Sequence, residues 1–218
     1  AVDFCRLHLL ASHAATALAA AVNVILSPTT SVAFARAGML SNDGRCKTFD
    51  DRANGYVRAE GVGGLVLRSV AKDNAASVVL ELSGNAVRQD GLSASLTAPN
   101  GVAQSRLVAA AIASASMSPS DLRLIESHGT GTPLGDPTEI RSLVRASSDI
   151  SAPIYGIKAN LGHLEPAAGS AGLIVLTTSL KGRLAGACAQ LRTMNPKIAE
   201  ATLAGARIDF PTQPTAAA

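Results

Sequence analysis

The chain has 218 residues, of which 47% are hydrophobic and only 3% aromatic, with no tryptophan. This length suffices for one sizeable core or two small ones, built mainly from Ala, Val, Leu and Ile. Side chains of that size favour helices packed closely on sheets. With 19 basic and 16 acidic residues, the net charge of +3 is too small for a nucleic-acid-binding surface, so we expect no nucleic acid partner.

Three cysteines lie far apart at positions 5, 46 and 188. Their odd number and spacing favour neither a disulfide framework nor a metal site, so we expect no bound metal and a reducing setting. The first residues lack the order of a signal peptide, and the longest apolar runs are too short and Ala-rich to span a bilayer. We therefore expect no membrane span and an intracellular location, either the cytoplasm or the stroma or matrix of an organelle.

The first half of the chain predicts a helix over 1–15 and then a fully buried strand over 16–26. A short helix over 30–40 precedes a long polar loop over 41–61, a length typical of functional loops. Residues 63–91 predict two strands around a polar turn at Lys72–Ala75.

The second half begins with a helix over 101–117, followed by a second helix start in "SPSDL". Strands are predicted over 122–129 and 152–160. Helices are predicted over 136–148, with Asp136 as the N-cap, and over 165–183. The tail over 212–218 is expected to fray. Buried strands that alternate with helices indicate an α/β fold with helices on the sheet faces.

Two histidines and a lysine follow the last two buried strands. His128 begins a Gly-Thr-Gly-Thr turn, and His163 stands five residues after Lys158. Ends of strands are where α/β folds gather reactive groups. Each histidine taken alone is as readily an ordinary surface or core residue.

Two other interpretations of these segments are weaker. "GTGTPLG" is similar to a glycine-rich phosphate loop, but Pro133 has no N–H to donate and Asp136 puts a negative charge where a phosphate would bind. A zinc site would need a third ligand near the two histidines, and the sequence offers no good one.

Four segments together resemble the β-ketoacyl synthase family, most closely the ketosynthase domains of polyketide synthases and multifunctional fatty acid synthases. They are "CKTFDDRANGYVRAEG", "LTAPNG", "HGTGTPLGDPTE" and "KANLGHLEPAAGSAGL". The resemblance implies an incomplete thiolase-like fold, layered α/β/α/β/α when whole. It implies a partial ketosynthase domain over 1–211, with the end of the first half and connecting loops over 1–100 and the C-terminal half over 101–211.

The resemblance also implies a decarboxylative Claisen condensation, in which this fragment alone is not expected to be active. A malonyl-type thioester on the phosphopantetheine of an acyl carrier protein loses CO2, and its carbanion attacks an acyl chain held on a cysteine. No bound cofactor is implied. By motif match His128, His163 and Lys158 are catalytic, and Glu139 is a supporting residue through which Lys158 orders the histidines. The same match places the threonines Thr130 and Thr132 at the phosphopantetheine arm.

The position of the nucleophile depends on the alignment. "VDFC" is similar to the family's nucleophile motif, but using Cys5 there requires a deletion of about ten residues, or almost three helical turns. Without a gap, Cys5 is a small helix residue, buried or half buried, and the nucleophile and first half of the fold are expected to be absent. The closing Gly-Phe-Gly-Gly segment, which supplies an oxyanion-hole N–H, also has no counterpart after Phe210.

Further departures from the family pattern keep a second function open. Ala20 and Ala21 replace two glycines, Arg88 replaces an asparagine and Ser95 replaces a glycine. The alternative to an enzyme is a non-catalytic, ketosynthase-derived structural subunit of a larger complex. Because half of a duplicated core exposes an apolar face, we expect a homodimer, a complementing half or a larger assembly. The family pairs its subunits through the strand here predicted over 16–26.

Overall fold

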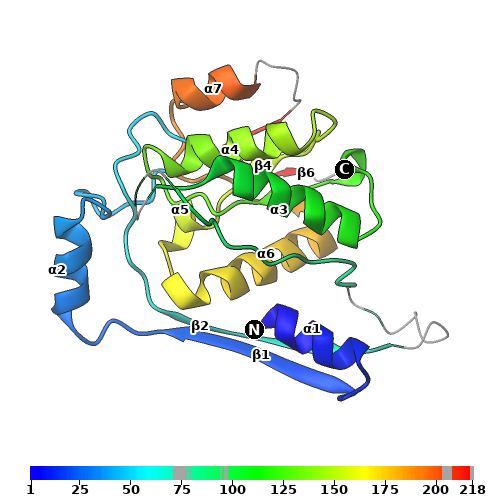
Figure 1. Ribbon diagram of the computed structural model, residues 1–218. Helices are drawn as coiled ribbons and strands as arrows, with labels where there is room; N and C mark the ends of the chain where they lie inside the picture. The colour runs from blue at the N-terminus through cyan, green and yellow to red at the C-terminus, as the bar shows by residue number, and fades with distance from the viewer. Residues whose placement is uncertain (71–77, 79, 94, 96–97, 203–207, 217–218) are drawn as a thin grey trace.

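The computed structural model of the chain describes residues 1–70, 78, 80–93, 95, 98–202 and 208–216 (Figure 1). Its helices are α1 (Val2–Leu10), α2 (Pro28–Arg36), α3 (Gly101–Ser114), α4 (Gly135–Ala146), α5 (Lys158–Leu161), α6 (Ala168–Gly182) and α7 (Pro196–Thr202), with short 3-10 helices η2 (Pro119–Asp121) and η3 (Glu165–Ala167). Its strands are β1 (Thr16–Asn23), β2 (Gly61–Arg68), β3 (Ile125–Glu126), β4 (Ile154–Tyr155), β5 (Leu184–Ala185) and β6 (Thr215–Ala216). Among the residues described, no helix combines the length and apolar character needed to cross a membrane.

The first layer is an antiparallel pair, in which β1 and β2 run in register from Thr16 opposite Arg68 to Asn23 opposite Gly61. Side chains alternate between the two faces, as strand geometry requires. The strand predicted over 16–26 forms over Thr16–Asn23, but the prediction that it is fully buried is wrong in this structure. Only one face is covered, and Leu18 and Val22 remain 67% and 59% exposed on the other.

Helix α6 separates this pair from the rest of the strands (Figure 1). On one side Ser170 and Ile174 approach Gly63 of β2, and on the opposite side Gly172 approaches the Glu126 side chain of β3. A Cβ at Gly63 would lie 2.9 Å from the Cβ of Ser170, so this approach requires glycine. The small residues at the start of α6 thus let one helix pack between two layers of strands.

The second layer contains the parallel pair β3–β4, and its core joins elements from both halves of the chain. Ile154 and Tyr155 of β4 pack with Ile140 and Leu143 of α4, and all but Leu143 are 1% exposed or less. Partly buried residues of α3 and α6 complete this cluster. The chain therefore forms four layers in the order β1–β2, α6, β3–β4, then α3 and α4, whereas the resemblance implies five layers for the whole fold.

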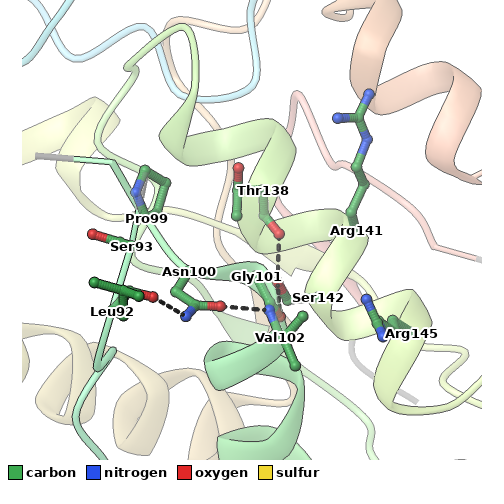
Figure 2. A pocket seen from close by; sticks show the side chains of 10 residues that line it. All are labelled: Leu92, Ser93, Pro99, Asn100, Gly101, Val102, Thr138, Arg141, Ser142 and Arg145. Atoms are coloured by element: carbon green, nitrogen blue, oxygen red, sulfur yellow. Dashed lines mark hydrogen bonds between the residues drawn. The ribbon is translucent and has the colours of Figure 1, made fainter. Parts of the chain in front are cut away.

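The start of α3 is fixed by Asn100, whose side chain accepts hydrogen bonds from the N–H groups of Val102 and Ala103. Its amide nitrogen also donates to the carbonyl oxygen of Leu92 at 3.1 Å (Figure 2). On α4, the Ser142 hydroxyl lies 2.6 Å from the Thr138 carbonyl oxygen and 3.1 Å from that of Gly101. These bonds join α3 to α4 and hold the helix that follows the His128 turn.

Three local predictions need correction. Helix α4 begins at Gly135 with Leu134 as its N-cap residue, so Asp136 is in the first turn and is not the cap. The second strand predicted within 63–91 does not form over 80–91, where no neighbouring strand pairs with the backbone. The turn at Lys72–Ala75 lies outside the described residues.

The tail is the third correction. Thr215 and Ala216 form β6, which pairs antiparallel with β5, so the tail contains a short strand that the sequence does not predict.

Candidate active site

His128 stands directly after β3, where a carboxylate holds the backbone. The Glu139 side chain accepts hydrogen bonds from the N–H groups of His128 at 2.6 Å and of Gly129 at 2.9 Å. The turn continues through Gly129 and Gly131, whose positive φ angles of 44° and 76° suit glycine. The family resemblance implies that Glu139 links Lys158 to the histidines, and in the structure its carboxylate contacts the His128 turn directly.

Asp136 supports the same turn from the first turn of α4. Its carboxylate accepts hydrogen bonds from the N–H groups of Gly131 and Phe49, and it is only 1% exposed. Burial raises the pKa of Asp136 to about 7. Phe49 is completely buried and has a φ of 63°, an uncommon value for a bulky residue. Asp136 therefore joins the long polar loop to the histidine turn.

His163 follows the short helix α5 and Gly162. Its backbone N–H donates to the Val57 carbonyl oxygen at 2.8 Å, which joins it to the long polar loop. Its ring Nδ1 accepts a hydrogen bond from the Glu165 N–H at 2.9 Å. Because Nδ1 is the acceptor, this bond assigns the proton of the neutral ring to Nε2, which is then free to donate.

The two imidazole rings lie together although they stand 35 residues apart in the sequence. The ring centroids of His128 and His163 are 5.4 Å apart, and the rings are nearly perpendicular at 84°. Tyr56 packs beside His163, with a centroid distance of 4.9 Å. The structure thus brings the two sequence-predicted histidines to one place, as expected where the carboxyl ends of the parallel strands β3 and β4 meet.

Lys158 begins α5 and is only 4% exposed. Burial lowers its pKa, while the carboxylates of Glu126 and Glu139 act in the opposite direction. Burial and then the nearby Lys158 charge lower the pKa of both His128 and His163 to about 4. Although one side of His128 faces solvent, both rings are therefore neutral at pH 7, the form that donates one hydrogen bond and accepts another.

Glu126 is a member of this cluster that the sequence analysis did not single out. Its carboxylate accepts a hydrogen bond from the Ile157 N–H, immediately before Lys158. Burial raises the pKa of Glu126 to about 8. The sequence could have indicated Glu126 by its position two residues before His128, because alternate residues of a strand face the same side.

The remaining predicted residues have structural partners. The hydroxyl oxygens of Thr130 and Thr132 are 3.2 Å apart, and Thr132 also accepts a hydrogen bond from the Gly135 N–H. Cys5 is a free thiol, buried on α1. Within the described part of the chain, no group of three or more potential ligands could hold a metal ion.

Comparison with known proteins agrees with this arrangement over nearly the whole chain. The family model "Beta-ketoacyl synthase, C-terminal domain" matches residues 79–192, and "Beta-ketoacyl synthase, N-terminal domain" matches residues 1–73. The chain belongs to the β-ketoacyl synthase family.

Similar curated proteins are polyketide synthases. The chain is 42% identical over 206 residues to a phenolphthiocerol/phthiocerol polyketide synthase of Mycobacterium tuberculosis, covering 90% of this chain and 9% of that protein. It is also 42% identical over 170 residues to erythronolide synthase EryA2 of Saccharopolyspora erythraea, covering 76% of this chain and 5% of that protein. The chain therefore spans less than a tenth of each of these relatives.

Solved ketosynthase structures match the whole chain. The oxazolomycin ketosynthase domain OzmH KS7 of Streptomyces albus JA3453 superposes with a TM-score of 0.91 at 30% identity, with 38% of that chain covered. The module 6 ketosynthase of the bacillaene synthase of Bacillus subtilis 168 gives 0.92 at 29%, with 40% covered. The chain therefore has a partial thiolase-like ketosynthase fold.

Proposed function

We propose that this chain supplies the histidine site of a ketosynthase, which performs a decarboxylative Claisen condensation of acyl and malonyl thioesters in polyketide or fatty acid biosynthesis. The observation that carries this proposal is the pair of neutral imidazoles 5.4 Å apart, with Nδ1 of His163 occupied by a backbone N–H. That arrangement leaves Nε2–H of His163 as a fixed donor beside the second ring.

The two histidines act on charge that develops during the reaction. When the malonyl carboxylate leaves as CO2, the electron pair of the broken C–C bond forms an enolate on the thioester oxygen. Hydrogen bonds from fixed imidazole N–H groups stabilise that oxygen more strongly as its charge grows. The enolate carbon then attacks an acyl thioester and expels its thiolate, or takes a proton from water when no acyl group is present.

The remaining roles follow from the same family match. Burial and then the Lys158 charge keep both rings neutral, Glu139 fixes the His128 turn, and Thr130 and Thr132 contact the phosphopantetheine arm of an acyl carrier protein. In this proposal the protein acts inside the cell with the carrier protein as its partner. The similar synthases named above support that setting.

Decarboxylation tests the site without a nucleophile. Incubation of the chain with malonyl-pantetheine thioester should give acetyl thioester and CO2, measured by mass spectrometry. His163→Ala should abolish the product, whereas His13→Ala, on the exposed turn after α1, should leave the rate unchanged. No decarboxylation above the background without protein would contradict the proposal.

Acyl transfer tests the alignment of Cys5. Because Cys5 is buried on α1, we expect no acyl adduct on it after incubation with an acyl thioester and mass measurement of the intact chain. A stoichiometric Cys5 adduct that transfers to a malonyl carrier would show that Cys5 is the nucleophile and that the gapped alignment is right.

A non-catalytic structural subunit is the second candidate, and the exposed apolar face of β1 and β2 favours it. Val62 and Val66 are 81% and 71% exposed there, beside Leu18 and Val22. A surface of this kind fits a component held within a larger complex. The candidates differ in one measurement, since a structural subunit within its complex would not decarboxylate the malonyl thioester.

A further inference from the structure

We propose that Arg58 and Glu165 are positioning residues for His163, because their ion pair holds the Glu165 backbone where its N–H fixes the hydrogen-bonding state of the imidazole. This inference rests on the proposed function for its catalytic meaning, but the structural part can be tested by itself.

The ion pair is bidentate and largely shielded from water. Arg58 Nε donates to Glu165 Oε1 at 2.6 Å, and Arg58 Nη2 donates to Glu165 Oε2 at 2.9 Å. The two side chains are only 9% and 16% exposed. A planar guanidinium matches both oxygens of a carboxylate, so the pair fixes orientation as well as distance. Arg58 lowers the pKa of Glu165, so the carboxylate is charged at neutral pH.

The backbone of Glu165 is in a conformation that needs such support. Its φ is 49°, in the left-handed region that costs a non-glycine residue free energy. The Glu165 N–H reaches Nδ1 of His163 at 2.9 Å in this conformation. The ion pair thus stabilises the same local backbone that supplies the hydrogen bond to the ring.

Arg58 is itself held on three sides. The residues on either side of it, Val57 and Ala59, form backbone hydrogen bonds with His163. The Ala59 N–H donates to the His163 carbonyl oxygen at 2.9 Å. Its Nη1 donates to the Ser31 hydroxyl of α2 at 2.7 Å, and its guanidinium lies 5.4 Å from the centre of the Phe34 ring. These contacts hold the guanidinium in position independently of Glu165. Helix α2 therefore helps to position the ion pair beside His163.

The chemical consequence concerns the tautomer. Without the Glu165 N–H at Nδ1, the neutral ring can carry its proton on either nitrogen, and the Nδ1–H form cannot donate from Nε2. Loss of one hydrogen bond of ordinary strength corresponds to about a fivefold change in the ratio of the two tautomers. The fraction of molecules able to donate to the enolate oxygen would fall accordingly.

The test uses the 218-residue chain labelled with 15N at its four histidines, in the assembly that it forms in solution. Two-bond 15N–1H spectra report the tautomer of each ring, and His163→Gln assigns the His163 signals. We expect Arg58→Met and Glu165→Gln each to lower the Nε2–H to Nδ1–H ratio of His163 about fivefold, with no further loss in the double variant. Arg58→Lys keeps the charge but not the bidentate geometry, and should give an intermediate ratio.

Arg52→Met is the matched control. It breaks another short pair, between Arg52 Nε and Asp50 Oδ1 at 2.7 Å, that does not contact His163, so the tautomer ratio should not change. A folded Arg58→Met or Glu165→Gln chain with the wild-type ratio would overturn the proposal. If these variants do not fold, a wild-type ratio in folded Arg58→Lys would do the same.

Decarboxylation of malonyl-pantetheine by the same samples separates the two proposals. A tautomer shift in the variants, when the wild-type chain itself shows no decarboxylase activity, supports the positioning role and contradicts the proposed function. Activity in all variants with an unchanged tautomer contradicts the positioning role alone.

Discussion

At the scale of single residues, the cluster around Lys158 contains a carboxyl group whose ionisation opposes folding. Burial raises the pKa of Glu126 from 4.5 to about 8. Between these values the folded chain keeps a proton that the unfolded chain has released, so stability falls as pH rises. Glu126→Gln cannot ionise and still offers an oxygen to the Ile157 N–H. We therefore expect its free energy of unfolding to fall less than that of the wild type between pH 5 and pH 8.

Urea unfolding at both pH values measures this difference, which cannot exceed about 1.4 kcal/mol per pH unit and is smaller because Glu126 is only partly buried. Glu81→Gln is the control, since it makes the same chemical change at an exposed residue outside the Lys158 cluster. Equal pH dependence in wild type and Glu126→Gln would show that Glu126 ionises normally in the folded chain.

The residue scale also shows why part of the site could be predicted. His128 and His163 each follow a predicted strand, and neighbouring strand ends meet in α/β folds, so sequence order was enough to bring them together. The partners of their backbones were not predictable in this way. Arg58 and Glu165 stand 107 residues apart and carry no local pattern that pairs them. Asp136 was predicted as an N-cap, but its carboxylate accepts hydrogen bonds from the N–H groups of Gly131 in the His128 turn and of Phe49 in the long polar loop.

At the scale of secondary structure elements, the cap of α3 should be important for stability. Asn100 accepts hydrogen bonds from the N–H groups of Val102 and Ala103, which have no partner within the helix. Asn100→Ala should lower the free energy of unfolding by about 1 kcal/mol or somewhat more, because two further bonds from its amide are also lost. Denaturant unfolding measures this change.

Two variants sharpen this prediction. Asn100→Asp keeps the acceptor and should lose less stability than Asn100→Ala. Ser27→Ala removes a longer cap bond of 3.3 Å from α2, which buries none of its residues, and should have a smaller effect still. An Asn100→Ala chain as stable as the wild type would mean that α3 is held by packing alone.

Helices were easier to predict than strands because their signals are local. Caps, apolar periodicity and Pro positions located α3, α4 and α6 to within a few residues. The strand predicted in the second part of 63–91 depended on a neighbour that the pattern does not specify, and no pairing forms over 80–91. Burial of β1 likewise depended on what covers its second face, which a strand's own sequence cannot show.

At the scale of the whole molecule, the uncovered face of β1 and β2 predicts association. Cross-strand pairs Leu18–Val66 and Val22–Val62 form a continuous apolar face, and each of these side chains is at least 59% exposed. In the described residues β1 pairs only with β2, so its other edge also offers unpaired N–H and C=O groups. An apolar face and an open strand edge of this kind mark a surface where another chain binds. We therefore expect the chain to form a dimer, to bind a complementing half or to occupy a larger assembly.

Sedimentation of the purified chain, together with binding of a hydrophobic dye, tests this expectation. Val66→Lys places a charge in the centre of the apolar face while the strand pairing of Val66 with Leu18 remains, so it should weaken association and increase the monomer fraction. Asp43→Asn is the control. It removes a charge that pairs with the buried Lys47 (4% exposed) outside the apolar face, so it should not change the association state. A compact monomer of 22.0 kDa that binds no dye would show that the apolar face is covered within the chain itself.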